Sequence, residues 1–538
     1  MSKFQVIFLS IFLVIAGCAE EVSEKKSIDS FEQTYWVEDY TKDLNFPWAI
    51  TWLPNGDLLV TERLGKIKLI RKGNIISELQ GVPEVMVSSP FDGLLDIKID
   101  PDFKTSPYIY LSFTKGTTTE RVGVVYRAKI EGNKLVDGEE IFNTSPPAPT
   151  GGPNITRINF LSDKSIVAAV GSSGQHAYGM VQRLDGDIGK IIRINRDGSV
   201  PIDNALAVKN QNAKAELWAT GLRSIGGLTL DDNDQLWGIE MGPQGGDELN
   251  LIEGGGNYGF PLVSWGFDYS GRALSEKQTA AGFVDPVVTW SPSISPYGIT
   301  FYQGEAFPKW NGDFFVGVLG DQTILRMRIS DGKLIEQQDL LYHLNERIRS
   351  VETGPDGFIY AVTDSSNGKI IRLRPGTPSE KELANVSKPF PMPKNSDIGE
   401  RLRQHGVMQN EETMLAIQAA YDSERAKFIY NQNCVSCHSL TADSESNIGP
   451  HLESIAGRRS GSLPNYNYSA AMKMNNQTSV IWDSRTIAAY ITNPQAIFPG
   501  TKMVSTPLNF EDAVQVSNYL TRLNPKENQH KVKLIRLI

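Results

Sequence analysis

The chain has 538 residues, of which 9% are aromatic, with 48 glycines and 29 prolines. This length exceeds one ordinary domain, and the composition is typical of a folded, turn-rich β protein with a substantial core. A formal net charge of −9 at pH 7 and the lack of any basic stretch exclude nucleic acid as a partner.

The first 17 residues have the pattern of a signal peptide. Lys3 precedes an apolar run from Phe4 to Ala16, which is short for a transmembrane span, and the sequence IAGC follows at residues 15–18. This resembles a bacterial lipoprotein signal, in which cleavage precedes Cys18 and its thiol carries diacylglycerol. The alternative is an ordinary secretory signal with an incidental cysteine.

The signal resemblance implies that the mature chain works outside the cytoplasm. Ala19 stands where an inner-membrane retention signal would have Asp. We therefore expect an outer-membrane lipid anchor facing the periplasm, with the lipid as the only contact with the membrane. Residues 18–35 are predicted to be the spacer that follows this anchor.

Residues 36–376 contain six copies of a turn followed by a short apolar β run, as expected for the inner strands of propeller blades. The copies are LPNGDLLVTE (53–62), DPDFKTSPYIYLSF (100–113), LSDKSIVAAV (161–170), DDNDQLWGIE (231–240), WNGDFFVGVL (310–319) and GPDGFIYAVT (354–363). A β-sandwich would explain the strands but not six copies of one unit. The sequence thus predicts an all-β six-bladed propeller with long loops on one face.

The order of these units resembles the soluble glucose/sorbosone (aldose sugar) dehydrogenases, six-bladed propellers that bind pyrroloquinoline quinone (PQQ) and calcium. The resemblance is carried by FPWAITWLPNGDLLVTERLGKI, GLLDIKIDPDF, GKIIRINRDGSVPIDN, MGPQGGDELNLIEGGGNYGFPL and RIRSVETGPDGFIYAVTD. It implies oxidation of an aldose or related polyol at a quinone site.

The same resemblance implies the residues of that site. Arg223 would bind the quinone, and Arg347 and Arg349 would clamp its carboxylates. In the family the carbonyl groups corresponding to Gly242 and Pro243 hold the calcium ion that polarises the quinone, while Glu248 and Tyr258 match a second, structural calcium site. The alternative is that this loop is rich in glycine only because a blade turn needs it.

The catalytic base of the family does not carry over. That base is a His in a His-Phe-Gly-x-Arg stretch, where this chain reads GGPNITRINF (151–160), and alignment on Arg157 puts Pro153 at the His position. Proline cannot accept a proton. Three further departures are Phe91 for Gln, Ser224 for Asn, and Gly320 or Asp321 for Lys.

Three other residues could supply a base. His176, in GSSGQHAYG (171–179), is near the end of a predicted inner strand, and Asp92 and Glu240 are carboxylates at blade ends. Each can equally be a structural residue. Two functions therefore remain open: a dehydrogenase with an altered base, or a catalytically lapsed propeller that serves as a scaffold for the second domain.

The second domain follows a tether. Residues 374–400, RPGTPSEKELANVSKPFPMPKNSDIGE, are rich in Pro, Ser, Lys and Glu, so residues 377–415 are predicted to be a semi-extended linker. Residues 416–526 form the predicted small domain, and residues 527–538 a tail.

NQNCVSCHSL (431–440) holds the other two cysteines, Cys434 and Cys437. Paired cysteines in an exported protein normally form a disulfide, and a thioredoxin-like pair is the rival interpretation. That interpretation needs a βαβ unit and leaves His438 without a use. Cys-x-x-Cys-His in an exported chain is instead typical of covalent c-type haem attachment.

Residues 449–503 resemble an all-α class I cytochrome c of the mitochondrial type, through GPHLESIAGRRSG, NYNYSAAM and VIWDSRTIAAYITNPQAIFPGTKM. The resemblance implies one haem c attached to Cys434 and Cys437, with His438 and Met503 as axial iron ligands. Two axial protein ligands leave no position for oxygen. The haem would therefore pass electrons from the propeller to a periplasmic or membrane electron acceptor.

The resemblance also implies residues that support the haem. The Pro450 carbonyl would accept from Nδ1 of His438, the Tyr490 hydroxyl would point at the Met503 sulfur, Thr501 would steady that loop, and Arg458 and Trp482 would hold a propionate. Met472 departs from the family, which usually has Asn there. Two helices should frame the domain, over 423–432 and from the capping residue Asn509 onward.

Overall fold

The structure is a computed structural model that describes residues 33, 35–149, 153–172, 174–268, 272–290, 293–320, 322–341, 346–376, 378–379, 381–382, 421–442, 448–456, 458, 460–463, 466, 468–469, 472, 482, 484–497, 501–503 and 508–523. The predicted signal peptide, Cys18, nearly all of the spacer and linker, and the tail lie outside these residues. No helix of the described part is long and apolar enough to cross a membrane.

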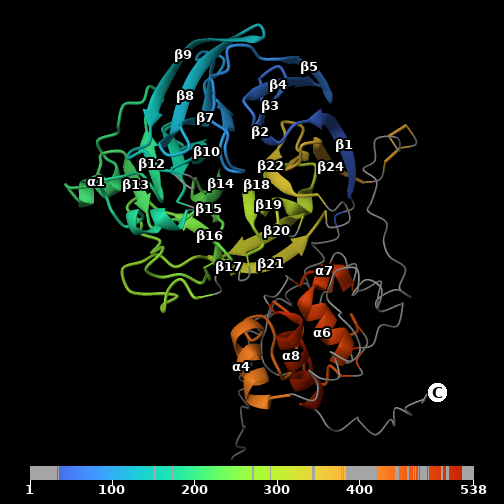
Figure 1. Cartoon of the computed structure of the whole chain (residues 1–538). Coiled ribbons are helices and arrows are strands. Elements are labelled where there is room, and N and C mark those ends of the chain that lie inside the picture. The colour runs from blue at the N-terminus through green and yellow to red at the C-terminus, as the bar shows by residue number, and fades with distance from the viewer. Residues whose placement is uncertain are drawn as a thin grey trace, which may run out of the picture.

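The first part of the chain forms six antiparallel sheets of four strands, arranged in a ring in Figure 1. Blades one to three contain β2 (Pro47–Trp52), β3 (Leu58–Glu62), β4 (Lys66–Arg71), β5 (Asn74–Glu78); β6 (Leu94–Ile99), β7 (Tyr108–Gly116), β8 (Arg121–Glu131), β9 (Lys134–Asn143); and β10 (Ile155–Phe160), β11 (Ile166–Val170), β12 (Lys190–Ile194), β13 (Leu217–Thr220).

Blades four to six contain β14 (Ile225–Leu230), β15 (Leu236–Glu240), β16 (Asp247–Ile252), β17 (Val288–Trp290); β18 (Pro296–Phe301), β19 (Phe314–Val318), β20 (Thr323–Ser330), β21 (Lys333–Asp339); and β22 (Ile348–Thr353), β23 (Ile359–Thr363), β24 (Gly368–Pro375). The fourth strand of blade six is β1 (Tyr35–Leu44), which pairs with β24 and so closes the ring with the start of the chain. Short helices η2 (Gln175–Met180), α1 (Ala205–Lys209) and η3 (Pro308–Trp310) lie in connections.

The six predicted units fall on the second strand of each blade, one place out from the strand nearest the axis. Successive blades contact one another through their first strands, β2, β6, β10, β14, β18 and β22, which therefore line the central axis. The local turn signal marks where the first strand ends. Gly56, Gly312 and Gly357 have φ values of 86°, 85° and 75° in these turns, a conformation that favours glycine.

Antiparallel alternation gives the propeller two distinct faces. We call the face where the first strands begin the entry face, and the face where they turn into the second strands the turn face. Long connections occur on both, residues 171–189 on the entry face and residues 253–287 on the turn face. The expectation of long loops on one face only was therefore wrong.

The second part of the chain is helical, with α4 (Ser423–Asn433), α6 (Ser484–Thr492), α7 (Pro494–Ile497) and α8 (Phe510–Arg522), drawn orange to red in Figure 1. Both predicted helices are confirmed, and the Asn509 side chain accepts from the Asp512 amide at the start of α8. Arg425 of α4 pairs with Glu511 and Asp512 of α8, at 3.1 and 2.7 Å, and so joins the two helices.

Candidate functional site

Arg347 and Arg349 stand at the start of β22, on the entry face of blade six. The Arg349 guanidinium is 2.9 Å from the Asp364 carboxylate, and Arg347 lies 3.3 Å from the same carboxylate. Burial would raise the pKa of Asp364, but the guanidinium groups of Arg349 and Arg347 hold it below its usual value. The predicted pair thus shares one ionised carboxylate.

Arg349 is almost fully buried on the central axis, at 2% exposure. Its guanidinium carbon lies 4.3 Å from the ring centroid of Trp48 in β2 and 4.5 Å from that of Tyr297 in β18. Among the described residues, Nε and Nη1 of Arg349, Nε1 of Trp48 and the Tyr297 hydroxyl have no hydrogen-bond partner. Four unsatisfied polar atoms from three blades in one place call for a bound group that the protein itself does not supply.

Arg223, at the start of β14, connects two entry-face loops. Its Nη1 donates to the Met241 carbonyl at 2.6 Å, and its Nε donates to the Tyr178 hydroxyl of η2 at 3.2 Å. This places the predicted quinone ligand beside the Gly242–Pro243 segment that the sequence assigned to calcium.

The Gly242–Pro243 loop is held by Asp247, a fully buried carboxylate at the start of β16. One carboxylate oxygen accepts from the Gly242 amide at 2.7 Å, and the other accepts from Ile294 and Ser295 at 2.7 and 3.0 Å. A Cβ atom at position 242 would overlap the Gly245 carbonyl. The glycine is therefore required by the loop itself, whatever the loop binds.

Three acidic side chains crowd the same end of blade four. Glu240 and Glu248 are cross-strand partners in β15 and β16, and Asp247 adjoins them. Burial raises the pKa of Asp247 and of Glu248 to about 7, and burial together with Glu248 raises the pKa of Glu240 well above its usual value. Their charged forms are disfavoured unless a cation lies nearby.

Glu248 and Tyr258 are not brought together through their side chains. Tyr258 donates its hydroxyl to the Leu251 carbonyl at 2.7 Å, three residues along β16 from Glu248, which is about 10 Å of strand. No group of three or more His, Cys, Asp and Glu in the described part of the chain has metal-binding geometry. The predicted second calcium site therefore lacks a side-chain cage there, and stays a prediction that rests on Glu248 and backbone oxygens.

The candidate bases differ in their surroundings. Pro153 is buried before β10 and its carbonyl accepts from Thr144. Asp92 is enclosed, because Arg121 and Ser88 both bind its Oδ2 and Asn154 donates to its Oδ1.

Two candidates remain. Glu240 accepts from the Arg223 amide through Oε1, and its Oε2 has no partner among the described residues. His176 lies in η2, two residues before Tyr178, and its side chain is outside the described part of the structure.

The other departures from the family also have clear positions. Phe91 packs partly buried against the core, and Ser224 is buried with its carbonyl accepting from Met241 at 3.0 Å. The Gly320 amide donates to the Ile294 carbonyl at 3.0 Å, and Asp321 lies outside the described residues.

Arg63 belongs to the same cluster and was missed. It follows β3 on the entry face, within electrostatic range of Asp364, Arg349 and Asp92, and burial lowers its pKa. The segment TERLGKI (61–67), which contains Arg63, carries the family resemblance but no signal of its own for a site. An arginine after a blade strand gives no sign by itself that it faces the axis.

In the helical part, Cys434, Cys437 and His438 form one continuous turn after α4. The amides of Cys437 and His438 both donate to the Cys434 carbonyl, at 3.1 and 2.9 Å, and no disulfide joins Cys434 to Cys437. Burial raises the pKa of Cys434 to about 12, and burial also raises that of Cys437. Burial thus disfavours the thiolate form of both sulfurs.

His438 is oriented by the segment that follows. Its Nδ1 lies 2.8 Å from the Pro450 carbonyl, the partner that the sequence predicted, while the Tyr430 hydroxyl donates to the His438 carbonyl at 2.7 Å. Burial lowers the pKa of His438, so the imidazole is neutral and carries its proton on Nδ1. Nε2 is then the nitrogen with a lone pair for a metal.

The Met503 loop is held by Thr501. The Met503 amide donates to the Thr501 hydroxyl at 3.3 Å, and Gln495 donates to the Thr501 carbonyl at 3.1 Å. The Tyr490 hydroxyl pairs with the Thr501 hydroxyl. The predicted contact of Tyr490 with the Met503 sulfur stays a prediction.

Arg458 and Trp482 are brought together, because the Trp482 amide donates to the Arg458 carbonyl at 2.9 Å. The Arg458 guanidinium donates to the carbonyls of Glu453 and His451 at 3.1 and 2.9 Å, and burial lowers its pKa. Met472, the departure from the family, is buried in the core of this unit.

Comparison with known proteins decides the family. A family model described as Glucose / Sorbosone dehydrogenase matches residues 44–372, which is more than half of the chain. The chain belongs to the glucose/sorbosone dehydrogenase family. A second model, Cytochrome c, matches residues 423–524. The predicted architecture, a six-bladed propeller followed by a small helical cytochrome c domain, is confirmed, and the second domain implies haem c.

Relatives of this glucose/sorbosone dehydrogenase family member cover each domain separately. Aldose sugar dehydrogenase YliI of Escherichia coli (strain K12) is 34% identical over 347 residues, 63% of this chain and 92% of that protein. Cytochrome c2 of Rhodoplanes tepidamans is 36% identical over 95 residues, 18% of this chain and 86% of that protein.

Solved structures match the propeller. The soluble aldose sugar dehydrogenase of Escherichia coli in the apo-form has a TM-score of 0.61 at 33% identity and covers 64% of this chain and 100% of that one. The PQQ-bound form of aldose sugar dehydrogenase from Streptomyces coelicolor has a TM-score of 0.52 at 26% identity and covers 64% and 98%.

Proposed function

We propose that this chain oxidises an aldose or related polyol at a PQQ site on the entry face of the propeller and passes the electrons to haem c in its own second domain. One observation carries the proposal. The buried Arg349 guanidinium has two nitrogens without partners, beside Arg347, in a family whose Streptomyces coelicolor member is known in a PQQ-bound form.

The charge at the axis fits a cofactor with several carboxylates. Arg63, Arg347 and Arg349 gather around the single carboxylate of Asp364, which leaves an excess of positive charge. Guanidinium groups bind carboxylates through paired N–H donors. The indole N–H of Trp48 and the Tyr297 hydroxyl add two neutral donors beside them.

When bound, PQQ supplies a carbonyl that accepts two electrons from the sugar. Arg223 keeps the Met241 carbonyl in place, and Asp247 fixes the amide of Gly242, so the carbonyls of Gly242 and Pro243 would be presented to Ca²⁺ in a fixed loop. A Ca²⁺ ion there would also offset the crowded carboxyls of blade four.

A residue of the chain must accept the proton of the sugar hydroxyl. Pro153 cannot, and Asp92 is enclosed by its partners, which leaves Glu240 and His176. A general base contributes roughly 10²–10⁴-fold to rate. Of the variants Glu240→Gln and His176→Ala, the one that removes the base should slow aldose-driven haem reduction by that factor while quinone binding persists.

The electrons then reach a haem that the second domain would attach through Cys434 and Cys437. His438, held through Nδ1 by Pro450, and Met503, on the loop fixed by Thr501, would hold its iron. Arg458 and Trp482 would sit at its edge. A periplasmic or membrane acceptor would take the electrons, with the chain anchored in the outer membrane through Cys18.

The test is a fluorescence titration of the purified holo-cytochrome with PQQ and Ca²⁺, followed by aldose addition with haem reduction recorded. Binding and reduction support the enzyme. No binding by the wild type would leave the alternative, a lapsed propeller that acts as a scaffold, which the proline at position 153 favours. For the anchor, Cys18→Ala should release the chain from the membrane fraction.

A further inference from the structure

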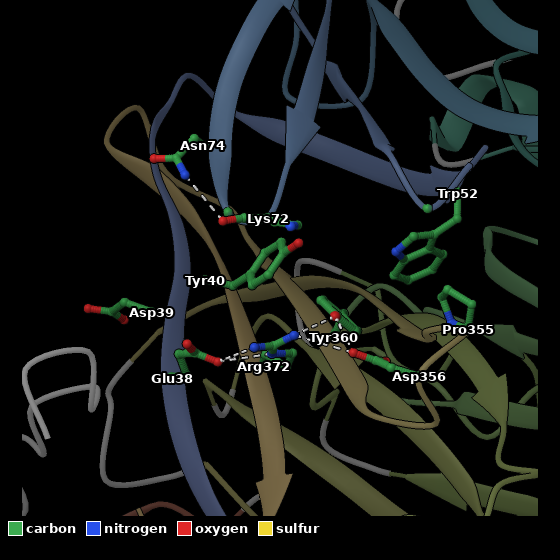
Figure 2. A pocket seen from close by; sticks show the side chains of 12 residues that line it. Glu38, Asp39, Tyr40, Trp52, Lys72, Asn74, Pro355, Asp356, Tyr360 and Arg372 are labelled. Carbon is green, nitrogen blue, oxygen red and sulfur yellow. Dashed lines mark hydrogen bonds and ion pairs between the residues drawn. The ribbon is translucent and has the colours of Figure 1, made fainter. Parts of the chain in front are cut away.

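A pocket of about 540 Å³ lies on the turn face, where blade six meets blade one (Figure 2). Its lining includes Gly56, in the turn after β2, Pro355 and Asp356, in the turn after β22, and Lys72, Gly73 and Asn74, at the turn between β4 and β5. The quinone site lies where the first strands begin. A six-residue first strand such as β2 spans about 20 Å, so the two sites are on opposite faces.

The floor of the pocket is a closed polar network around Arg372 of β24. Its Nε and Nη2 donate to Glu38 at 2.9 and 2.6 Å, and its Nη1 donates to the Tyr360 hydroxyl at 2.9 Å and to Asp356 at 3.3 Å. Tyr360 in turn donates to Asp356 at 2.8 Å. The guanidinium is therefore fully engaged, and Lys72 is the one lining cation without a carboxylate partner among the described residues.

The walls of the pocket are aromatic. Tyr40 of β1 and Trp52 of β2 stand apart across the cavity in Figure 2, and both rings are half-buried. Each makes an edge contact with Tyr360, with centroids 5.3 and 5.0 Å apart at 88° and 73°. One buried ring thus fixes the orientation of two accessible ones, so the walls are preformed.

The charges argue against ionic ligands. Glu38 pairs with Arg372, and Asp39 pairs with Lys42 and Lys369, so the ion pairs of the lining are closed. Lys72 alone gives a phosphate or carboxylate no paired cationic anchor. An organic cation would seek the face of Tyr40, but the Arg372 guanidinium already lies 4.7 Å from that ring centroid. Burial raises the pKa of Tyr40, so its hydroxyl stays neutral at physiological pH.

We propose that this pocket binds a neutral saccharide. A pyranose ring presents apolar C–H faces that pack on aromatic rings and a rim of hydroxyls that both donate and accept hydrogen bonds. The pocket offers both in the right arrangement: Tyr40 and Trp52 as flat walls, and the oxygens of Glu38, Asp356 and Asn74 around them. Its volume is within the range of small-molecule sites. The site is independent of the quinone, because every group that forms it lies on the turn face.

The probe is methyl β-D-glucopyranoside, whose blocked anomeric carbon excludes oxidation by a sugar dehydrogenase. Binding to the full holo-chain without PQQ is followed by tryptophan fluorescence and by saturation-transfer NMR. Trp52→Ala should weaken binding about tenfold or more. Because Trp52 packs on Tyr360, Trp52→Phe is the second variant, and it should keep the fold and the NMR signal while losing the fluorescence response.

Trp218→Ala is the matched control. Trp218 borders a smaller cavity of about 280 Å³ and is the only aromatic among the described residues that line it. Its loss should leave glucoside binding unchanged.

Retardation of the chain in a gel containing dextran separates a glycan-binding site from one that takes only a free sugar, and either result supports a saccharide. The proposal is overturned if the wild type binds neither probe, if choline or inorganic phosphate competes for the pocket, or if Trp52→Ala and Trp218→Ala have equal effects.

Discussion

Asp364→Asn isolates the contribution of the carboxylate that the two site arginines share. Asp364 is 13% exposed and Arg349 2%, at 2.9 Å, so this pair is buried, whereas Arg347 is 48% exposed and adds little. Removing one partner of a buried pair costs about 3–5 kcal/mol, because the other charge is left uncompensated. We expect the propeller of the free protein to melt at least about 5 °C lower.

PQQ should reverse this loss. Without Asp364, the carboxylates of the cofactor have no competitor for Arg349, so they bind more tightly and stabilise the variant more than the wild type. A tenfold gain in affinity corresponds to about 1.4 kcal/mol. Thermal melts with and without saturating PQQ and Ca²⁺ measure both effects.

The matched control is Asp185→Asn, which breaks the exposed Arg183–Asp185 pair, with both side chains more than 60% exposed, and should barely change the melting temperature. The reasoning is refuted if Asp364→Asn melts with the wild type, or if PQQ raises both melting temperatures equally.

Three further predictions concern the haem domain and the acidic cluster. In Gly449→Ala, the new Cβ would overlap the His438 ring, nearest to Cε1 and 2.6 Å from Nδ1, so the ring must shift by roughly 1 Å or more. The low-spin haem spectrum should be lost, while Phe428→Ala, on the exposed face of α4, keeps it. Met503→Ala should keep covalent haem, as judged by mass, but open the sixth position and lower the reduction potential; release of haem would contradict the ligand assignment. Burial raises the pKa of Glu248 from 4.5 to about 7, so between these values the folded state keeps a proton that the unfolded state loses, and stability falls as pH rises from about 5 to about 7. Glu248→Gln should reduce the slope of the melting temperature over that interval without abolishing it, because burial also raises the pKa of Asp247 and of Glu240, whereas Glu276→Gln should leave the slope unchanged.

The fold was predictable to the extent that its signals are local. Each blade turn needs residues that accept positive φ, and each following strand is apolar, so six copies are visible in the sequence. The closing strand β1 is not, because its pairing with β24 joins residues such as Glu38 and Arg372, 334 positions apart. No short-range pattern reports a contact of that separation.

The haem site and the quinone site differ in how far each could be predicted from the sequence, for the same reason. Cys434, Cys437 and His438 lie within five residues, so spacing alone points to haem chemistry. Trp48 and Tyr297 come from blades one and five, and in strands of this kind an aromatic residue reads as ordinary core. Only the assembled ring brings them against Arg349 and leaves their polar atoms unpaired.

Arg349 also separates the two functions that the sequence left open. Each buried donor without a partner costs about 1–3 kcal/mol, and an apolar residue of similar size in place of a buried charge is often neutral or stabilising. A propeller that serves only as a scaffold would therefore lose nothing from the double variant Arg349→Met, Asp364→Asn, which should match or exceed the wild type in melting temperature. On the enzyme proposal the same variant is equally stable when free but no longer binds PQQ, and aldose no longer reduces its haem. Unchanged quinone binding in that double variant would mean that the quinone sits elsewhere and that the unpaired Arg349 guanidinium has another role.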